Sequence, residues 1–356
     1  MREPLRIPAR RSLLGVVPSR HWCLPARRSL LALLALIVSV LAAGNAAAGM
    51  VGAATGLDPG GLAPIQAQTL TPAQGLSAQS RMQAAPRLMR GDYPSVGVSS
   101  RAIVWVLAQM HLFFGALVLA VPLFVLVIEL VGVYTGDARY DDMAHEFMKI
   151  SLTGFSLTAI FGGSLALALF LLYPDFMGYM MRVFGAQWLV YAALFFLESL
   201  FLYTYYYGWN AMRYGNLKWV HLSLGLMLNA AGTTIMVLAN SWSTFMMAPS
   251  GVNEVGAVIG NIWEVMKGPL WNPLNLHRFI ANIAFAGAVV GAYAAFKFLS
   301  SSDPQQRAHY DWMGYTSNFI AILAFLPLPF AGYWLMAEIY AYSQKMGITA
   351  MGGILA

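Results

Sequence analysis

Long apolar stretches recur along the chain from residue 102 to its end, and short polar segments separate them. A helix needs about 20 apolar residues to cross the roughly 30 Å hydrocarbon core of a bilayer. Six stretches reach that length, at about 102–133, 148–173, 185–208, 218–241, 274–298 and 312–338. The pattern therefore predicts an all-α fold, a polytopic transmembrane helical bundle of about six spans.

The part before residue 101 follows a different pattern. Residues 1–28 are rich in arginine and precede an apolar segment, 29–50, that ends in small residues. This is typical of a secretory leader and also fits an uncleaved anchor helix. Residues 51–100 are rich in Gly, Ala, Pro and Gln without an apolar period, so we expect a flexible tail that carries no chemistry. The transmembrane domain is predicted at 101–356.

Loops between the predicted spans are short except one. Residues 242–273 are long enough to form an amphipathic surface element with room for a partner or substrate. Cytoplasmic loops carry an excess of Lys and Arg. If the first span is entered from outside, the inner loops hold Arg139, Lys149, Arg213, Lys218, Lys297 and Arg307. The outer loops then hold Arg182, Lys267, Arg278 and Lys345, so the excess favours this orientation.

Composition and charge narrow the class of protein. Hydrophobic residues make up 59% of the chain and charged residues 10%, a balance that a single water-soluble core cannot accommodate. The net charge of +6 comes partly from the arginine-rich start, so we interpret it as a targeting and topology signal and expect no nucleic-acid partner. Cys23 is the only cysteine, which excludes an iron–sulfur cluster and a covalently attached haem. A metal centre would need His, Met or carboxylate ligands.

Two ionisable residues lie deep in predicted spans, where such groups are costly and are functional candidates. Glu198, in FFLESLFLYTYYYGW, lies near the middle of the third span. It could exchange protons in a relay, or stay protonated and donate to a facing carbonyl or hydroxyl. His111, in the first span beside Phe113, Phe114 and Gly115, could be an axial haem ligand or a buried histidine that donates one hydrogen bond to a neighbouring helix.

Other polar residues lie closer to the ends of the spans. His221 and His277 could each ligate a metal or form hydrogen bonds at the membrane surface. Glu129 is predicted to be an interfacial carboxylate, and His145 and His309 to be solvated. An aromatic belt at the membrane interface explains Tyr203, Tyr205, Tyr206, Tyr207 and Trp209. Close helix packing explains Gly162, Gly163, Gly287 and Gly291.

Three segments, AQMHLFFGALVLAVPLFVLVIE, FFLESLFLYTYYYGW and MVLANSWSTFMMAPSGV, together resemble the first half of subunit I of the cytochrome bd quinol oxidases. The resemblance covers about residues 102–300 and extends to about 338. It implies a haem-bearing bundle that oxidises quinol near the outer face and reduces oxygen together with a related second subunit. On this resemblance His111 ligates a haem of the oxygen-reducing site and Glu198 delivers protons to it. The implied cofactors are one or more haem b groups, with haem d as a further candidate.

The sequence departs from this family pattern at several positions. Two acidic positions of the family fall on Val190 and Ala168, and its fifth-span haem-ligating histidine falls on Ala281. His277, one helical turn earlier on the same face, could take over that role with a shifted haem. His221 is the other candidate for this haem-ligand role, but it lies at the opposite membrane face. The family's later spans carry further haem ligands, which a separate polypeptide would supply in a complete oxidase core.

Two hypotheses follow. The first is a haem-bearing subunit of a bd-like oxidase in a bacterial inner membrane, which passes electrons from quinol or a cytochrome c towards oxygen with proton uptake. Its partners would be a second bd-type subunit or other membrane redox subunits. The second is a non-catalytic scaffold or electron conduit, favoured by the missing carboxylates and ligand. A transporter that uses Glu198 is disfavoured because the spans show no inverted repeat.

Overall fold

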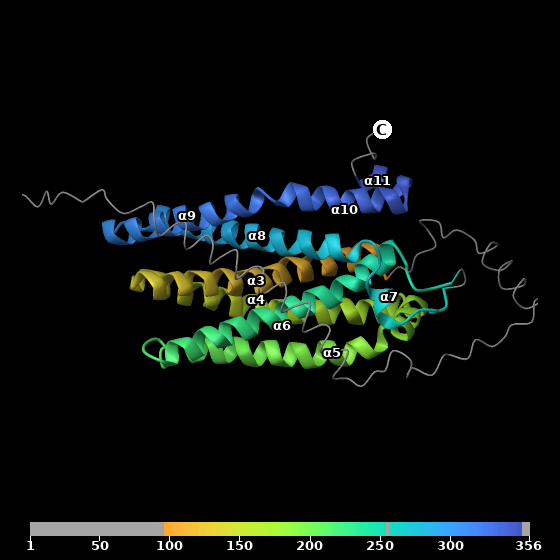
Figure 1. Cartoon of the computed structure of the whole chain (residues 1–356), viewed down its shortest axis with the longest axis horizontal. Coiled ribbons are helices and arrows are strands. Elements are labelled where there is room, and N and C mark those ends of the chain that lie inside the picture. Colours follow the sequence, from red (N-terminus) through yellow and green to blue (C-terminus); the bar gives the residue numbers. More distant parts are fainter. Residues whose placement is uncertain (1–95, 254–255, 351–356) are drawn as a thin grey trace, which may run out of the picture. The chain divides into compact units, whose positions relative to one another are not determined.

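The computed structural model describes residues 96–253 and 256–350 (Figure 1). The predicted leader or anchor at 1–50 lies outside the described residues, and so does nearly all of the predicted tail at 51–100. Both stay predictions. The first described helix begins at Ser100.

Six membrane-length helical stretches follow one another, as the apolar pattern predicts. They are α3 (Ser100–Thr135), α4 (Ala138–Leu172), α5 (Pro174–Tyr207), α6 (Leu217–Met247), α8 (Trp271–Ser300) and the pair α9 (Pro304–Phe325) and α10 (Leu328–Tyr342). The described part also contains two short helices, α7 (Ile262–Met266) and α11 (Gln344–Ala350), and its only β pairing is an isolated bridge between Val252 and Val258. The predicted all-α polytopic bundle is confirmed.

Three helices begin earlier than the predicted spans. Helix α4 starts at Ala138 instead of near 148, α5 at Pro174 instead of near 185, and α9 at Pro304 instead of near 312. The added turns contain charged residues, among them Asp141, Asp175 and Arg307, so an apolar pattern leaves them out. The start signals are local: the side chains of Asp137 and Asp303 cap α4 and α9 by accepting from backbone N–H groups, and proline opens α5 and α9.

The predicted surface loop at 242–273 is shorter than expected. Helix α6 continues to Met247 instead of ending near residue 241. The rest of the connection contains α7, which Asn261 caps through its side-chain oxygen. The Tyr179 hydroxyl of α5 donates to the Gly256 carbonyl at 3.0 Å and attaches the connection to the bundle.

Helix α3 lies at the centre of the helix contacts. It packs against α4, α6 and α8, while α5 packs against α6 and α8 against α9. Figure 1 shows these long helices lying lengthwise beside one another. Of the most apolar 18-residue window of α3, 67% is buried, compared with 6% in α4 and 11% in the α9–α10 stretch. Helices α4, α9 and α10 therefore offer apolar surface to lipid, and α3 can hold side chains that need a protein environment.

The last membrane stretch is divided into two helices. Helix α9 ends at Phe325 and α10 begins at Leu328, with Pro327 and Pro329 at the break. Proline lacks a backbone N–H and its ring blocks the preceding turn, so the helical ladder cannot continue through this point. The stretch consists of two segments with a joint between them.

Candidate functional site

His111 of α3 is fixed by one ring nitrogen and free at the other. Its Nδ1 lies 3.0 Å from the backbone oxygen of Thr158 in α4. A carbonyl oxygen only accepts, so Nδ1 carries the hydrogen and Nε2 keeps its lone pair. Nε2 has no hydrogen-bond partner among the described residues. This tautomer, held by a backbone carbonyl, is the one in which histidine ligates a metal through Nε2.

Gly162 of α4 makes room for this imidazole. A Cβ on Gly162 would lie 2.7 Å from His111 Cε1 and 2.8 Å from Nδ1, closer than any side chain tolerates. A Cβ on the neighbouring Gly163 would meet nothing within 4 Å. The predicted role of Gly162 in close helix packing is thus more specific, because the glycine allows the His111 ring to lie against α4.

His277 of α8 is half-buried, and neither of its ring nitrogens has a hydrogen-bond partner in the described part of the chain. The next residue, Arg278, donates from Nη1 to Asn240 Oδ1 of α6, and Asn240 Nδ2 donates to Asn275 Oδ1 at 2.6 Å. Arg278 has no carboxylate within ion-pair distance among the described residues. The guanidinium therefore meets neutral amides and lacks a counter-anion.

The two candidate ligands lie at different depths. The rings of Phe113 in α3 and Phe285 in α8 touch edge to face, with centroids 5.6 Å apart. At a rise of 1.5 Å per residue, His111 lies about 3 Å and His277 about 12 Å from that contact, each towards the start of its helix. The two imidazoles could therefore serve two separate centres, with a depth difference of about 9 Å.

Glu198 of α5 is a buried carboxyl group without a polar partner. Its side chain is packed against Gly232 of α6, where a Cβ would lie 2.7 Å from Oε1 and 3.1 Å from the side chain of Leu119. The residue is 5% exposed, and no hydrogen bond or ion pair reaches its carboxyl group from the described residues. The expected facing carbonyl or hydroxyl is absent from that set. Leu119 follows His111 by eight residues, so Glu198 lies about 12 Å from the His111 level along α3.

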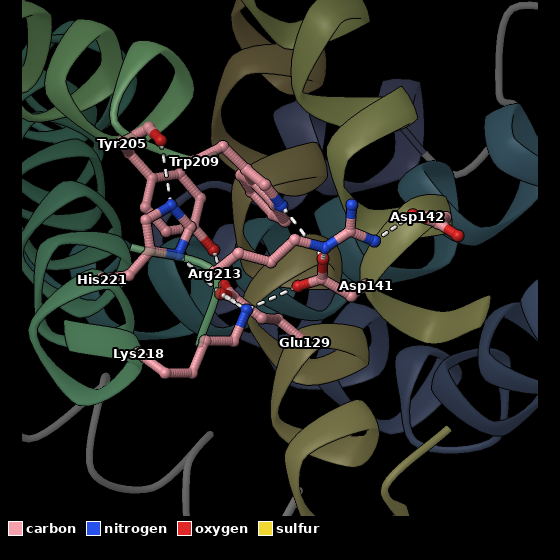
Figure 2. A network of polar contacts seen from close by, with 8 residues as sticks. All are labelled: Glu129, Asp141, Asp142, Tyr205, Trp209, Arg213, Lys218 and His221. Carbon is pink, nitrogen blue, oxygen red and sulfur yellow. Dashed lines mark hydrogen bonds and ion pairs between the residues drawn. The ribbon is translucent and has the colours of Figure 1, made fainter. Parts of the chain in front are cut away.

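A second set of polar side chains gathers where α3, α4, α5 and α6 come together at the other end of α3 (Figure 2). Glu129 of α3 is fully buried and receives three contacts. Its Oε1 lies 2.5 Å from His221 Nδ1 and 2.5 Å from Lys218 Nζ, and the Tyr205 hydroxyl donates to Oε2. His221 Nε2 donates to the Tyr205 backbone oxygen at 2.9 Å. Both ring nitrogens of His221 are therefore occupied.

The same set of contacts continues into the first turn of α4. Lys218 Nζ also lies 2.5 Å from Asp141 Oδ1, and Arg213 Nε lies 2.6 Å from Asp141 Oδ2. Arg213 forms a second ion pair with the exposed Asp142, and Trp209 Nε1 donates to Asp141 at 3.3 Å. We call these side chains the Glu129 network: Glu129, Asp141, Asp142, Tyr205, Trp209, Arg213, Lys218 and His221 (Figure 2).

A tight turn and a pocket set the surroundings of this network. Gly136 adopts φ +69°, a left-handed conformation that favours glycine, and ends α3 so that α4 can start at once. Glu129 and Asp141 are thereby brought to the same level. A pocket of about 300 Å³ is lined by both carboxylates and by Arg213 and Lys218. Arg139 hydrogen-bonds to Asp137 in the same turn and lowers the pKa of that half-buried carboxyl group.

Several sequence-based assignments change here. Glu129 is 0% exposed and is not an interfacial carboxylate, because Lys218 and His221 compensate its charge. Tyr205 and Trp209 are buried at 0% and 1% and do not belong to an interfacial belt, because they pack on His221. His145, predicted to be solvated, stacks on Trp209 with ring centroids 5.1 Å apart.

The chain matches a family model described as cytochrome bd terminal oxidase subunit I over residues 99–356. It is 24% identical over 204 residues to the putative cytochrome bd menaquinol oxidase subunit I of Bacillus subtilis (strain 168), which covers 57% of this chain and 45% of that protein. It is 27% identical over 190 residues to the cytochrome bd-II ubiquinol oxidase subunit 1 of Escherichia coli (strain K12), covering 52% and 35%.

Its fold is similar to that of the bd oxidase from Geobacillus thermodenitrificans, with a TM-score of 0.62 and 20% identity over 68% of this chain and 56% of that one. The chain spans less than half the length of either curated relative. Its six apolar helices agree with a multi-pass bacterial membrane protein. Because the family match extends over all the described helices, the resemblance carried by the three sequence segments is confirmed, and the chain belongs to the cytochrome bd terminal oxidase subunit I family.

Proposed function

We propose that the protein is a haem-bearing membrane subunit of a bd-like oxidase that passes electrons from quinol or a cytochrome c towards oxygen with proton uptake. The observation that carries this proposal is the state of His111. Its Nδ1 is bonded to the Thr158 carbonyl and its Nε2 is free, which is the arrangement of a histidine prepared to ligate haem iron.

The residues around the two free histidines fit a haem. Gly162 leaves the space that the His111 imidazole needs. Arg278 offers a positive charge without a carboxylate partner beside His277, and a haem propionate would neutralise it. His111 would hold one haem and His277 a second. When bound, haem supplies one-electron transfer and an iron that can bind oxygen. One or more haem b groups are the first expectation, and haem d is the other candidate.

We assign the proton-handling role to Glu198. The carboxyl group is buried against Leu119 and Gly232 without a hydrogen-bond partner, so the neutral, protonated form is the one that its surroundings favour. A carboxyl group held in this way can give its proton to a nearby group that becomes more basic and then take up another proton. Its position, about 12 Å along α3 from the His111 level, is on the side of the Glu129 network.

His221 receives a different assignment from the other two histidines. Both of its ring nitrogens are hydrogen-bonded, to Glu129 and to the Tyr205 backbone, and the ring is fully buried. A haem iron could bind His221 only if one of these bonds were given up. We therefore propose His111 and His277 as the haem ligands and place His221 in the Glu129 network.

Partners and donor follow from the relatives. Both curated relatives are named as one subunit of an oxidase, one for menaquinol and the other for ubiquinol. We propose that this chain works with a second bd-type subunit, or with other membrane redox subunits, and accepts electrons from a quinol, with a cytochrome c as the other candidate donor. The family match favours this role over a non-catalytic scaffold or electron conduit.

The test is a reduced-minus-oxidised optical spectrum of the purified membrane complex, with and without carbon monoxide, and a haem count per chain. A CO-sensitive band is expected if one haem has an open coordination position. Haem that is wholly insensitive to CO would contradict the oxidase role, and so would a complex without haem.

The carboxyl group of Glu198 is tested by exchange for an amide. Glu198→Gln should keep the haem content and slow oxygen consumption by about a hundredfold, the size of effect typical of a positioned acid–base group. Glu338→Gln, a carboxylate in α10 whose neighbour is Trp334, is the matched control and should keep full turnover. Equal rates for the two variants would contradict the assignment.

A further inference from the structure

The pocket beside the Glu129 network lies between two helical hairpins that present opposite charges to it. Its carboxylates, Glu129, Asp137 and Asp141, belong to α3, to α4 and to the turn between these helices. Its cations, Arg213 and Lys218, belong to the turn after α5 and to the start of α6. Figure 2 shows charged groups of the two hairpins meeting at this boundary. A pocket with carboxylates on one hairpin and cations on the other fits a ligand that carries both charges.

The charges of the network balance within the chain. Three carboxylates are paired with two cations: Glu129, Asp141, Asp142, Arg213 and Lys218. His221 Nε2 donates to a carbonyl oxygen and Nδ1 lies 2.5 Å from Glu129 Oε1, so a proton must lie between these last two atoms. With that proton the network is neutral. A ligand with a net charge would leave that charge uncompensated, which is costly at a buried site, so the pocket favours a neutral zwitterion.

Both hairpins keep polar groups available beside the pocket. Arg213 uses Nε and Nη2 for its two ion pairs, and its Nη1 has no hydrogen-bond partner among the described residues. Val133 in the last turn of α3 and the following Gly136 also line the pocket. The last carbonyl oxygens of a helix lack partners within the helix, and this end of the helix dipole favours a cation. A phosphate can therefore bind at Arg213 and an ammonium at the end of α3.

The rim of the pocket is aromatic and continues into apolar surface. Tyr214 and Trp219 line the pocket and are 75% and 54% exposed. Val220, Leu226 and Met227 extend the exposed apolar surface along α6. Tyrosine and tryptophan are enriched where a membrane meets water, at the level of the lipid head groups. The pocket therefore opens at head-group level, and α6 offers the neighbouring surface to acyl chains.

The size of the pocket and its hydrogen-bonding groups narrow the kind of head group. Its volume of about 300 Å³ is at the lower end of the range for ligand pockets, about 300–1,000 Å³, which leaves room for a head group while the acyl chains stay outside. A primary ammonium donates three hydrogen bonds to oxygen acceptors, whereas a quaternary choline donates none. An anionic head group would meet the carboxylates of the α3–α4 hairpin without an ammonium to compensate them.

We infer that this pocket binds the head group of a phosphatidylethanolamine from the membrane leaflet at this end of the bundle. The ammonium group binds at the α3–α4 hairpin, and the phosphate binds at Arg213 beside the start of α6. One lipid thereby links the two hairpins and stabilises the folded chain. The inference goes beyond the proposed function and does not depend on haem.

The first test is thermal unfolding of the full chain in its purified membrane complex, after bound lipid has been exchanged for detergent. Phosphatidylethanolamine, phosphatidylcholine and phosphatidylglycerol with the same acyl chains are added back separately. Phosphatidylethanolamine should raise the unfolding temperature by about 5 °C, the shift expected for a ligand at about 100 times its Kd. The other two lipids should have little effect. Equal shifts with all three lipids overturn the inference, and so does the absence of a shift with phosphatidylethanolamine.

The second test fills the pocket without removing a charge. Ala138, the first residue of α4, is exposed and lines the pocket, so Ala138→Phe places a phenyl group there. This variant should lose the shift with phosphatidylethanolamine and retain one molecule of that lipid fewer per chain in native mass spectrometry. Ala308→Phe is the matched control, because Ala308 is an exposed alanine near the start of α9 and does not line the pocket. Equal lipid retention in the two variants overturns the assignment of the lipid to this pocket.

Two further measurements separate the possible outcomes. Soluble phosphoethanolamine carries the same charges without acyl chains, and it should leave the unfolding temperature unchanged at the concentration of the lipid. An equal rise would assign the pocket to a soluble ligand and overturn the lipid. A haem count on the same samples tests the proposed function separately, because a preparation without haem contradicts that function and leaves the lipid-dependent shift as it is.

Discussion

Glu129 and Glu198 are both buried carboxyl groups where α3 meets α5 and α6, and their surroundings are opposites. Glu129 contacts Lys218, His221 and the Tyr205 hydroxyl. Glu198 lies against Gly232, as does Leu119, and it receives no hydrogen bond from the described residues. The first group is part of a charge-balanced set, and the second relies on its own proton for neutrality.

The histidines repeat this difference. His221 has both ring nitrogens bonded, and His111 has one bonded and one free. The polar groups at the end of α3 near Glu129 are therefore hydrogen-bonded within the chain. At the other end, His111 keeps a free ring nitrogen that can bind a ligand. Burial alone therefore does not identify a reactive group. A buried polar group is a candidate when a hydrogen-bond donor or acceptor position on it has no partner.

The largest expected effect is the loss of a network carboxylate. Glu129→Ala leaves Lys218 without its deepest partner, and breaking a buried ion pair from one side costs about 3–5 kcal/mol. Glu198→Ala removes a group that has no partner to lose, so the cost should be limited to packing. Thermal unfolding in detergent, followed by circular dichroism, should show a much larger drop for Glu129→Ala. Equal drops would remove the distinction between the two glutamates.

The next effect separates the two histidines by cofactor content. His111→Ala should lose one haem per chain while the protein still inserts, because Nε2 is the free ligand. His221→Ala should keep its haem and lower the unfolding temperature, since two buried partners, Glu129 and the Tyr205 carbonyl, each lose a hydrogen bond worth about 1–3 kcal/mol. A haem count on membranes checks both variants, and haem loss in His221→Ala would contradict the comparison.

A smaller effect tests the space around His111. Gly162→Ala places a methyl group 2.7 Å from the imidazole, and such overpacking typically costs about 1–3 kcal/mol. The ring must tilt, so the optical spectrum of the bound haem should shift. Gly163→Ala adds the same methyl group where nothing lies within 4 Å and should leave the spectrum as it is. A shift in both variants, or in neither, would show that the His111 ring does not depend on Gly162.

The smallest effect concerns Asp137, a half-buried carboxylate in the turn between α3 and α4. Asp137 caps α4, and Asp137→Ala should cost about 1 kcal/mol of unfolding free energy. Arg139 lowers the pKa of Asp137 in the folded state. The contribution of the Asp137–Arg139 interaction to the free energy of unfolding is therefore fully present above the unfolded pKa of Asp137, about 3.9. It is lost as pH falls through the lower folded pKa. Asp137→Asn keeps a capping oxygen and should lose only this pH-dependent part, as unfolding measured across acidic pH would reveal.

The bundle and two of its polar groups were predictable because apolar sequence makes them conspicuous. Six long runs predict six spans, and His111 and Glu198 stand out as polar residues within such runs. The Glu129 network was not predictable in the same way. Glu129 and His221 are 92 residues apart, and Asp141 lies in the polar start of a helix that hydropathy does not detect.

The aromatic cluster illustrates the same limit. Tyr203 and Tyr207 are 41% and 71% exposed, whereas Tyr205 and Trp209 are buried. Residues four apart share a face of a helix, so two faces alternate within one aromatic run. Only the packing of α6 against α5 decides which face is inside. Composition suggests one belt, and the structure divides it between the surface and the network.

The packing of Glu198 on α6 also has a consequence for biogenesis. The most apolar 18-residue window of α5 has the lowest mean hydropathy among those of the six membrane stretches, 1.5, and the helix carries the carboxyl group of Glu198. An ionisable residue at the centre of an isolated helix costs about 2.5–3.5 kcal/mol during insertion. Helix α6 brings Gly232 against that carboxyl group. We expect α5 to leave the insertion machinery together with α6, as a helical hairpin in which Glu198 is covered before it meets lipid.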